Sequence, residues 1–190
     1  MKRLAAFGLL FSIATATSAL ASTEAWRVDP NHAAAQFTAR HFGIVPVTGS
    51  IPVKKVVVKL EPDSQIPIEV SAELDPSNVD THNGSRDNDL RSGHYFDVAS
   101  FPEMTFHSTK ITGTDPKHFT IVGNLTMHGQ THPITLNAAV VGANKTPRGR
   151  SVIAYSANGS LDRRQWGLGF GPIIVANGID ISLNVEADGP

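Results

Sequence analysis

Two histidines flank a short turn in the middle of the sequence and are the first candidates for metal chemistry. His128 and His132 are separated by three residues, the first of which is Gly129. Two imidazoles facing each other across a hairpin suit Zn²⁺ or Cu²⁺, and a complete site needs a third ligand, for which His107 or His118 is available. The structural alternative is that His128 hydrogen-bonds its turn and His132 is solvated. We favour this alternative and expect no bound metal.

A compact cluster of charges, Arg86, Asp87, Asp89 and Arg91, is the second candidate site. An arginine here suits a phosphate or carbonyl head group, because the guanidinium donates charge-assisted hydrogen bonds to such oxygens. The structural alternative is that the arginines pair with nearby carboxylates and fix the segment to the rest of the fold. We favour this second interpretation for at least one of the two arginines.

The sequence lacks the short motifs of the common catalytic sites. It contains no cysteine, no G-x-S-x-G, no H-E-x-x-H and no glycine-rich phosphate loop. We therefore predict a binding protein and not an enzyme, with an uncharacterised hydrolase as the alternative. The 16 Lys and Arg residues are balanced by 17 Asp and Glu residues, so no basic excess favours a nucleic-acid partner.

Residues 1–21 have the features of a cleaved secretory signal peptide. Lys2 and Arg3 precede an apolar run from Leu4 to Ala14, and Ala19-Leu20-Ala21 matches an A-x-A cleavage site. The run is too short to span a bilayer, so we do not expect an integral membrane protein. The remaining residues, 22–190, suit one exported domain, which is periplasmic if the host is a Gram-negative bacterium.

Apolar and polar residues alternate with a period of two through most of this domain, which predicts β-strands. Short links such as His128–Thr131 and Thr112–Pro116 leave no room for crossover helices, so we expect antiparallel neighbours. Asn177-Gly178 indicates a hairpin turn or a bulge in the last strand. The clear strands are Ile66–Leu74, Phe119–Met127, Ile134–Val140, Ile153–Leu161 and Ile179–Ala187, and the weaker ones are Ala33–Phe42, Val53–Leu60 and Met104–Thr112.

An all-β sheet of about eight strands, each with one apolar face, must close into a barrel or fold into a sandwich. We favour the barrel, because the strands are long and an eight-stranded barrel can hold one small ligand. The segment Asp80–Pro102 breaks the pattern and is expected to be a short helical insert. Asn83 or Ser85 would cap a helix that ends at Arg91, and His94–Ala99 would add a second helical turn.

Four blocks of sequence resemble the YceI-like family of bacterial exported polyisoprenoid-binding proteins. They follow the family's order over nearly all of residues 22–190. The blocks are Val28–His32 with Phe37–Phe42; Asn83, Arg86-Asp87, Leu90–Ser92, Phe96-Asp97 and Phe101-Pro102 with Thr105-Phe106; Gly123–Gly129 with Pro133-Ile134; and Asp162–Leu168.

This resemblance implies a lipocalin-like barrel whose apolar interior holds a long isoprenoid chain, as an exported carrier or sequestering protein. The ligand would be an isoprenoid lipid or a quinone, and no other cofactor is implied. Gly84, Ser85 and Asp89 depart from the family's usual residues in the insert, and Val53–Leu60 replaces a commoner aromatic-glycine pattern. We therefore assign no head-group chemistry to the insert from the resemblance alone.

The predicted ligand site combines inward-facing strand residues with the insert. Arg86, Arg91 and Phe96 are predicted to contact the head group or to gate the tunnel. Two partner hypotheses are kept open, transient contact with a membrane and a homodimer; the main alternative function is a periplasmic metal-binding protein. The predicted lining residues are Phe37, Ala39, Val70, Phe106, Leu125, Met127, Leu136, Tyr155, Leu161, Trp166 and Leu183.

Overall fold

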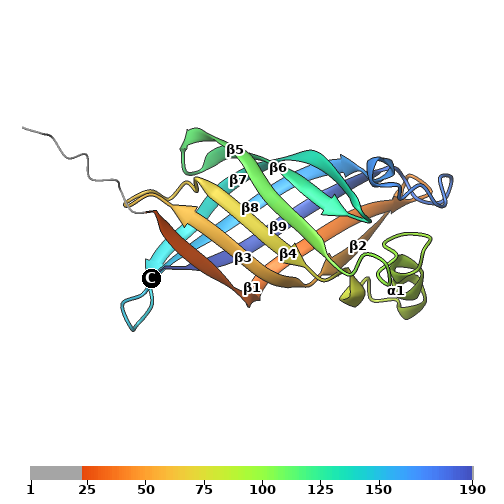
Figure 1. Ribbon diagram of the computed structural model, residues 1–190, viewed down its shortest axis with the longest axis horizontal. Coiled ribbons are helices and arrows are strands. Elements are labelled where there is room, and N and C mark those ends of the chain that lie inside the picture. The colour runs from red at the N-terminus through yellow and green to blue at the C-terminus, as the bar shows by residue number, and fades with distance from the viewer. Residues whose placement is uncertain (1–22, 190) are drawn as a thin grey trace, which may run out of the picture.

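The computed structural model describes residues 23–189, which form a closed antiparallel β-barrel with an insert at one end (Figure 1). β1 pairs with both β2 and β3, the strands from β3 to β9 pair in sequence order, and β1 pairs with β9 to close the sheet. The predicted signal peptide lies outside the described residues. The strands are β1 (Glu24–His41), β2 (Val45–Ile51), β3 (Val53–Leu60), β4 (Glu69–Leu74), β5 (Met104–Asp115), β6 (His118–Met127), β7 (Gln130–Lys145), β8 (Ser151–Asp162) and β9 (Gly178–Asp188).

Strands β2 and β3 are two halves of one long strand, so the barrel has the eight strands that the sequence predicts. Only Pro52 separates the halves, and both pair with β1; Ile51 of β2, for example, lies opposite Ala35. Proline has no N–H to donate to the ladder, so the pairing is interrupted there. The periodicity missed β2 because Pro46 and Gly49, which are rare in strands, obscure the alternation.

Strand β1 begins at Glu24, well before its predicted start at Ala33. A β-bulge between Val28 and Ala33 shifts the register of its pairing with β9. At this bulge the Asp29 carboxylate accepts a hydrogen bond from the Asn31 backbone N–H at 2.9 Å. The bulge inserts residues that break the period of two, which is why the sequence pattern located only the second half of the strand.

Two local predictions were wrong. Strand β4 begins at Glu69 and not at Ile66, since Pro67 cannot take part in the ladder. Asn177-Gly178 forms neither a hairpin nor a bulge. It ends the long loop between β8 and β9, and the Asn177 carbonyl accepts a hydrogen bond from the Arg163 N–H at 2.9 Å.

The link at His128 is a two-residue turn, with positive φ at both His128 and Gly129, as a type I′ hairpin requires.

The insert folds as predicted up to the end of its helix and differs beyond it. A short 3₁₀-helix, η1 (Pro76–Asn78), precedes the insert, and α1 (Gly84–Arg91) lies within it. Asn83, and not Ser85, caps α1, because its side chain accepts a hydrogen bond from the Arg86 N–H at 3.1 Å. The segment 94–99 consists of successive turns instead of a second helical turn. Asp97 has a φ of 44°, which right-handed helix excludes.

One end of the barrel carries the insert, the β1–β2 turn and the β8–β9 loop, and we call it the insert end (Figure 1). The loop includes a second 3₁₀-helix, η2 (Arg163–Trp166). Buried side chains fill the opposite end, so the remaining interior is approached from the insert end. The residues of this plug are Trp26, Val28, Leu60, Val140, Ile153 and Ala187. Within residues 23–189, no helix has the length and apolar character needed to cross a bilayer.

Candidate ligand-binding cavity

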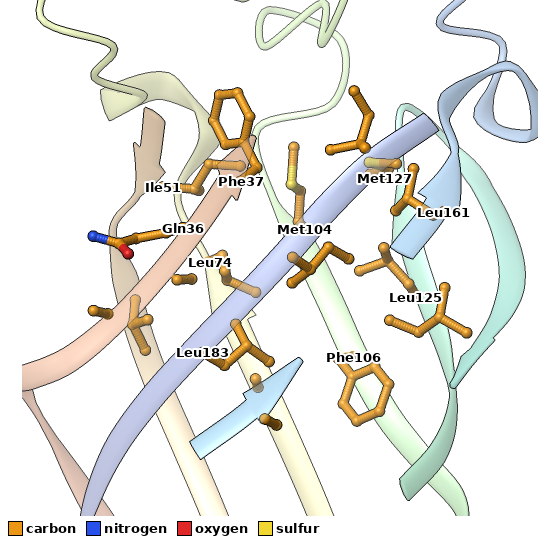
Figure 2. Close-up of a pocket in the computed structure, with 18 of the residues that line it drawn as sticks. Gln36, Phe37, Ile51, Leu74, Met104, Phe106, Leu125, Met127, Leu161 and Leu183 are labelled. Carbon is orange, nitrogen blue, oxygen red and sulfur yellow. The ribbon is translucent and has the colours of Figure 1, made fainter. Parts of the chain in front are cut away.

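An apolar cavity of about 240 Å³ occupies the barrel between the plug and the insert (Figure 2). Its lining on β6 extends from Phe119 to Met127, which corresponds to roughly 26 Å of strand at the usual rise per residue. The described residues of its lining include no aspartate, glutamate, lysine or histidine. The cavity is therefore long and suits an apolar chain, because burial of apolar area would be its main source of binding energy.

Most of the predicted lining residues surround this cavity, and Figure 2 labels six of them. Two predicted residues are buried but do not line it. Leu136 packs beside Gly159, where it fills the space of the missing side chain, and Trp166 lies in η2 with its indole N–H donating to the Leu125 carbonyl at 3.0 Å. The predicted residues that do line the cavity are Phe37, Ala39, Val70, Phe106, Leu125, Met127, Tyr155, Leu161 and Leu183.

An aromatic ring at the insert end of the cavity is held against the barrel wall by a glycine. Phe37 on β1 lies opposite Gly49 on β2, and a Cβ added to Gly49 would lie 2.5 Å from Phe37 Cζ. The ring thus occupies the volume that a side chain on β2 would need. Because this places the ring along the wall, the axis of the barrel stays open.

Few polar side chains belong to the lining residues, and the hydroxyl of Tyr155 has a partner in the protein. The Tyr155 hydroxyl donates to the Gln65 carbonyl at 3.0 Å, and burial raises the pKa of Tyr155. The amide of Gln36 lies apart from the apolar side chains in Figure 2. The hydroxyl of Tyr155 therefore closes the plugged end of the cavity, where it anchors the loop between β3 and β4.

Arg163 is buried at the insert end and organises the β8–β9 loop. Arg163 is among the lining residues of the cavity, and its hydrogen-bond donors go to backbone carbonyls of the loop. Burial lowers the pKa of Arg163. Nε donates to the Ala176 oxygen at 3.1 Å, and the terminal nitrogens donate to the oxygens of Leu168, Phe170 and Val175. This role was not predicted, because the acceptors are backbone carbonyls, which no pattern of residue types reveals.

The insert contributes apolar side chains to the cavity and keeps its predicted arginines outside the lining. Phe96, Leu90 and Tyr95 line the insert end, although only Phe96 was predicted as a site residue. Burial raises the pKa of Tyr95. Among the described residues, neither Arg86 nor Arg91 lines the cavity.

The two insert arginines bond to neutral groups, contrary to the expected pairing with a carboxylate. Arg86 donates from Nε to the Thr81 hydroxyl at 2.8 Å and from a terminal nitrogen to the Thr81 carbonyl at 2.9 Å. Arg91 donates to the Asn88 side-chain oxygen at 2.5 Å. Thr81 also donates to Asp87 at 2.6 Å, which holds the pKa of that carboxyl below its usual value. Asp87 therefore reaches Arg86 through Thr81, and this network fixes α1 to the preceding segment.

Both His128 and His132 contact Trp166 of η2. His128 Nδ1 lies 2.9 Å from the Trp166 carbonyl oxygen, and the His132 ring packs edge-on against the Trp166 ring with centroids 5.2 Å apart. His118 Nδ1 lies 2.9 Å from an Asp115 oxygen. In the part of the chain that the structure describes, no three histidine, aspartate or glutamate side chains are grouped as metal ligands.

A family model for the YceI-like domain matches residues 26–187. The chain belongs to the YceI-like family. A UPF0312 protein of Staphylococcus epidermidis is 30% identical to this YceI-like protein over 161 residues, which cover 83% of this chain and 90% of the relative. A UPF0312 protein of an Enterobacter species is 28% identical over 187 residues, which cover 97% of this chain and 96% of the relative.

Solved structures share the barrel of this YceI-like protein. A mutant CJ YCEI protein has a TM-score of 0.70 at 27% identity, over 78% of this chain and 88% of that one. BcnA of Burkholderia cenocepacia has a TM-score of 0.71 at 18% identity, over 84% and 98%. A polyisoprenoid binding domain from Saccharophagus degradans has a TM-score of 0.61 at 13% identity, over 88% and 99%. These matches confirm the lipocalin-like barrel that the sequence predicts.

Proposed function

We propose that this YceI-like protein binds a long-chain polyisoprenoid in the barrel and acts as its carrier or sequestering protein. The observation that carries the proposal is the cavity itself, which is long and is lined by apolar side chains from all the strands, β1 through β9. An isoprenoid chain offers only carbon and hydrogen, so it needs such a lining. Each buried CH₂ equivalent would contribute about 0.8 kcal/mol before the costs of ordering the chain.

The comparisons support a lipid over a polar ligand. The chain belongs to the YceI-like family, and a solved structure with the same fold is described as a polyisoprenoid binding domain. A quinone is a second ligand of the same class, because its isoprenoid tail makes the same apolar contacts while its ring sits at the insert end.

The head group or gate is proposed to lie at the insert end. Phe96 and Leu90 line the cavity there, and we propose Phe96 as the gate. Arg86 is committed to Thr81, whereas Arg91 bonds only its neighbour Asn88 in the same helix and is the better candidate for contacting a polar head group. The remaining predicted lining residues would contact the chain of the ligand.

The cavity favours binding over catalysis. General acid–base chemistry needs a titratable group within hydrogen-bond reach of the substrate. The lining residues that the structure describes include neither a carboxylate nor an imidazole.

The charged N-terminal segment and the apolar run that follows it support export, with the periplasm as the location in a Gram-negative host.

Organic extraction of the purified protein, followed by mass spectrometry of the extract, tests this function. We expect one class of isoprenoid lipid or quinone in near-equimolar amount. An extract without such a lipid, together with stoichiometric Zn²⁺ or Cu²⁺ in the protein, would overturn the proposal in favour of the metal-binding alternative.

A further inference from the structure

Large apolar side chains are exposed at the insert end, where a water-facing surface should carry polar residues. Ile44 in the β1–β2 turn is 74% exposed, and Ile173 in the β8–β9 loop is 84% exposed. Four further apolar side chains, in or next to this turn and this loop, are also exposed. We call the set the apolar rim, and its members are Phe42, Ile44, Val45, Phe170, Ile173 and Ile174.

Backbone hydrogen bonds join the two segments into one surface. The Phe42 N–H donates to the Ile174 carbonyl at 2.7 Å, and the Ala176 N–H donates to the Arg40 carbonyl at 2.9 Å. Both segments occupy the same end of the barrel in Figure 1. Phe170 stacks on His94 of the insert with ring centroids 4.1 Å apart, so the rim reaches the insert as well.

The rim is continuous with the cavity. Val175 and Leu168 belong to the same loop as Ile173, and both line the cavity. The backbone carbonyls beside them are held by buried Arg163. The loop therefore presents apolar side chains to the cavity on one side and to solvent on the other.

The charge pattern of the two segments fits a lipid surface. Residues 42–53 and 165–179 contain no Asp, Glu, Lys or Arg, although 17% of the whole chain is charged. Arg40 stands before the first segment, and Arg164, which is paired with Asp162, stands before the second. Apolar tips with a cation such as Arg40 behind them match the bilayer interface, where the tips enter the acyl boundary and the cation meets phosphate groups.

We propose that the apolar rim inserts into the surface of a lipid bilayer, from which the cavity loads its ligand. This inference rests on the proposed function, because a membrane is where an isoprenoid resides. A chain that crossed open water would lose its apolar contacts, whereas the rim provides an apolar path from the acyl region to the barrel. The rim therefore serves as the docking surface and the insert as the adjacent gate.

Flotation with phosphatidylethanolamine–phosphatidylglycerol vesicles tests the docking surface. We expect the wild-type protein to float with the vesicles and the double variant Ile44→Asp/Ile173→Asp to lose binding by at least about tenfold, because two exposed isoleucines that would enter the bilayer are replaced by charges. Val141→Asp is the matched control, since Val141 is 60% exposed on β7, toward the plugged end. This control should float as the wild type does.

A second measurement separates the docking surface from the cavity. Purified proteins are loaded with a polyisoprenoid alcohol from detergent micelles, where no bilayer is present, and the double variant should bind as much as the wild type. Failure of all proteins to bind from micelles would contradict the proposed function, whereas flotation tests the rim alone. A wild-type protein that does not float, or a double variant that floats equally, would overturn the docking surface. A wild-type dimer that the double variant converts to a monomer would assign the rim to a second copy instead.

Discussion

The ring of Phe106 lies over Gly123 of the neighbouring strand, so that a Cβ on Gly123 would lie 2.3 Å from Phe106 Cζ. Phe106 on β5 lines the cavity, and Gly123 belongs to β6, which pairs with β5. The same arrangement places Phe37 over Gly49. In both pairs the glycine lets the ring rest on the wall, which keeps the tunnel open.

Gly123→Ala should push Phe106 toward the barrel axis. We expect a loss of stability of about 1–3 kcal/mol, as is usual for overpacking, together with a lower lipid content. Urea unfolding and lipid extraction measure the two effects. Gly142→Ala is the control, because a Cβ at Gly142 on β7 meets no atom within 4 Å. If Gly123→Ala matches this control in both assays, the glycine does not set the position of the ring.

Ala72→Phe should fill the cavity without unfolding the barrel. Ala72 lines the cavity from β4, opposite Phe106, so a larger side chain there occupies the space of the ligand. We expect ligand binding to fall strongly while the midpoint of urea unfolding stays close to the wild-type value. Ala139→Phe, on β7 outside the cavity lining, is the comparison and should bind normally. Full binding by Ala72→Phe would place the ligand elsewhere.

Arg163→Met should loosen the β8–β9 loop. The guanidinium satisfies carbonyls of four loop residues, and each buried carbonyl left without a partner costs about 1–3 kcal/mol. We expect a loss of several kcal/mol in the free energy of unfolding, and faster proteolysis within residues 163–177. Exposed Arg148 supplies the control Arg148→Met, which should change neither measurement. Equal proteolysis of the two variants would show that Arg163 does not hold the loop.

Asp162 should contribute stability that disappears at acid pH. Hydrogen bonds from Arg164 lower the pKa of Asp162 from 3.8 to about 2. A carboxyl whose pKa is lower in the folded state stabilises the protein above the unfolded pKa, and this stabilisation fades as pH falls through the folded value. Between pH 4 and 2, Asp162→Asn should therefore lose less stability than the wild type does. Parallel slopes of unfolding free energy against pH for the two proteins would rule out this contribution.

The period-two pattern was sufficient to predict the barrel because each strand has one buried face. Strand β9 shows this clearly, since Ile179, Ile181, Leu183 and Val185 alternate with polar residues and all four line the cavity. The pattern failed where backbone features interrupt it, as at Pro52 and at the bulge after Val28. Such interruptions shift the register of strand pairing, but they leave the amino-acid composition of the strand almost unchanged.

The site was only partly predictable for a related reason. The alternation of inward- and outward-facing residues along a strand placed Phe37 and Leu125 correctly on the inner face of the barrel. The alternation alone cannot distinguish an inner residue beside open space from one that fills a gap, as Leu136 does beside Gly159. The role of Arg163 depends on carbonyls that converge only in the folded loop. The apolar rim likewise emerges when two segments distant in sequence meet at one end of the barrel.

Native mass spectrometry tests the central claim most directly, because it measures the mass of the intact protein together with any bound ligand. We predict that the wild-type protein carries one adduct, whose mass fits a polyisoprenoid chain with its head group, and that Ala72→Phe carries none. A wild-type protein without an adduct, or an equal adduct on Ala72→Phe, would contradict the claim that an isoprenoid occupies the cavity.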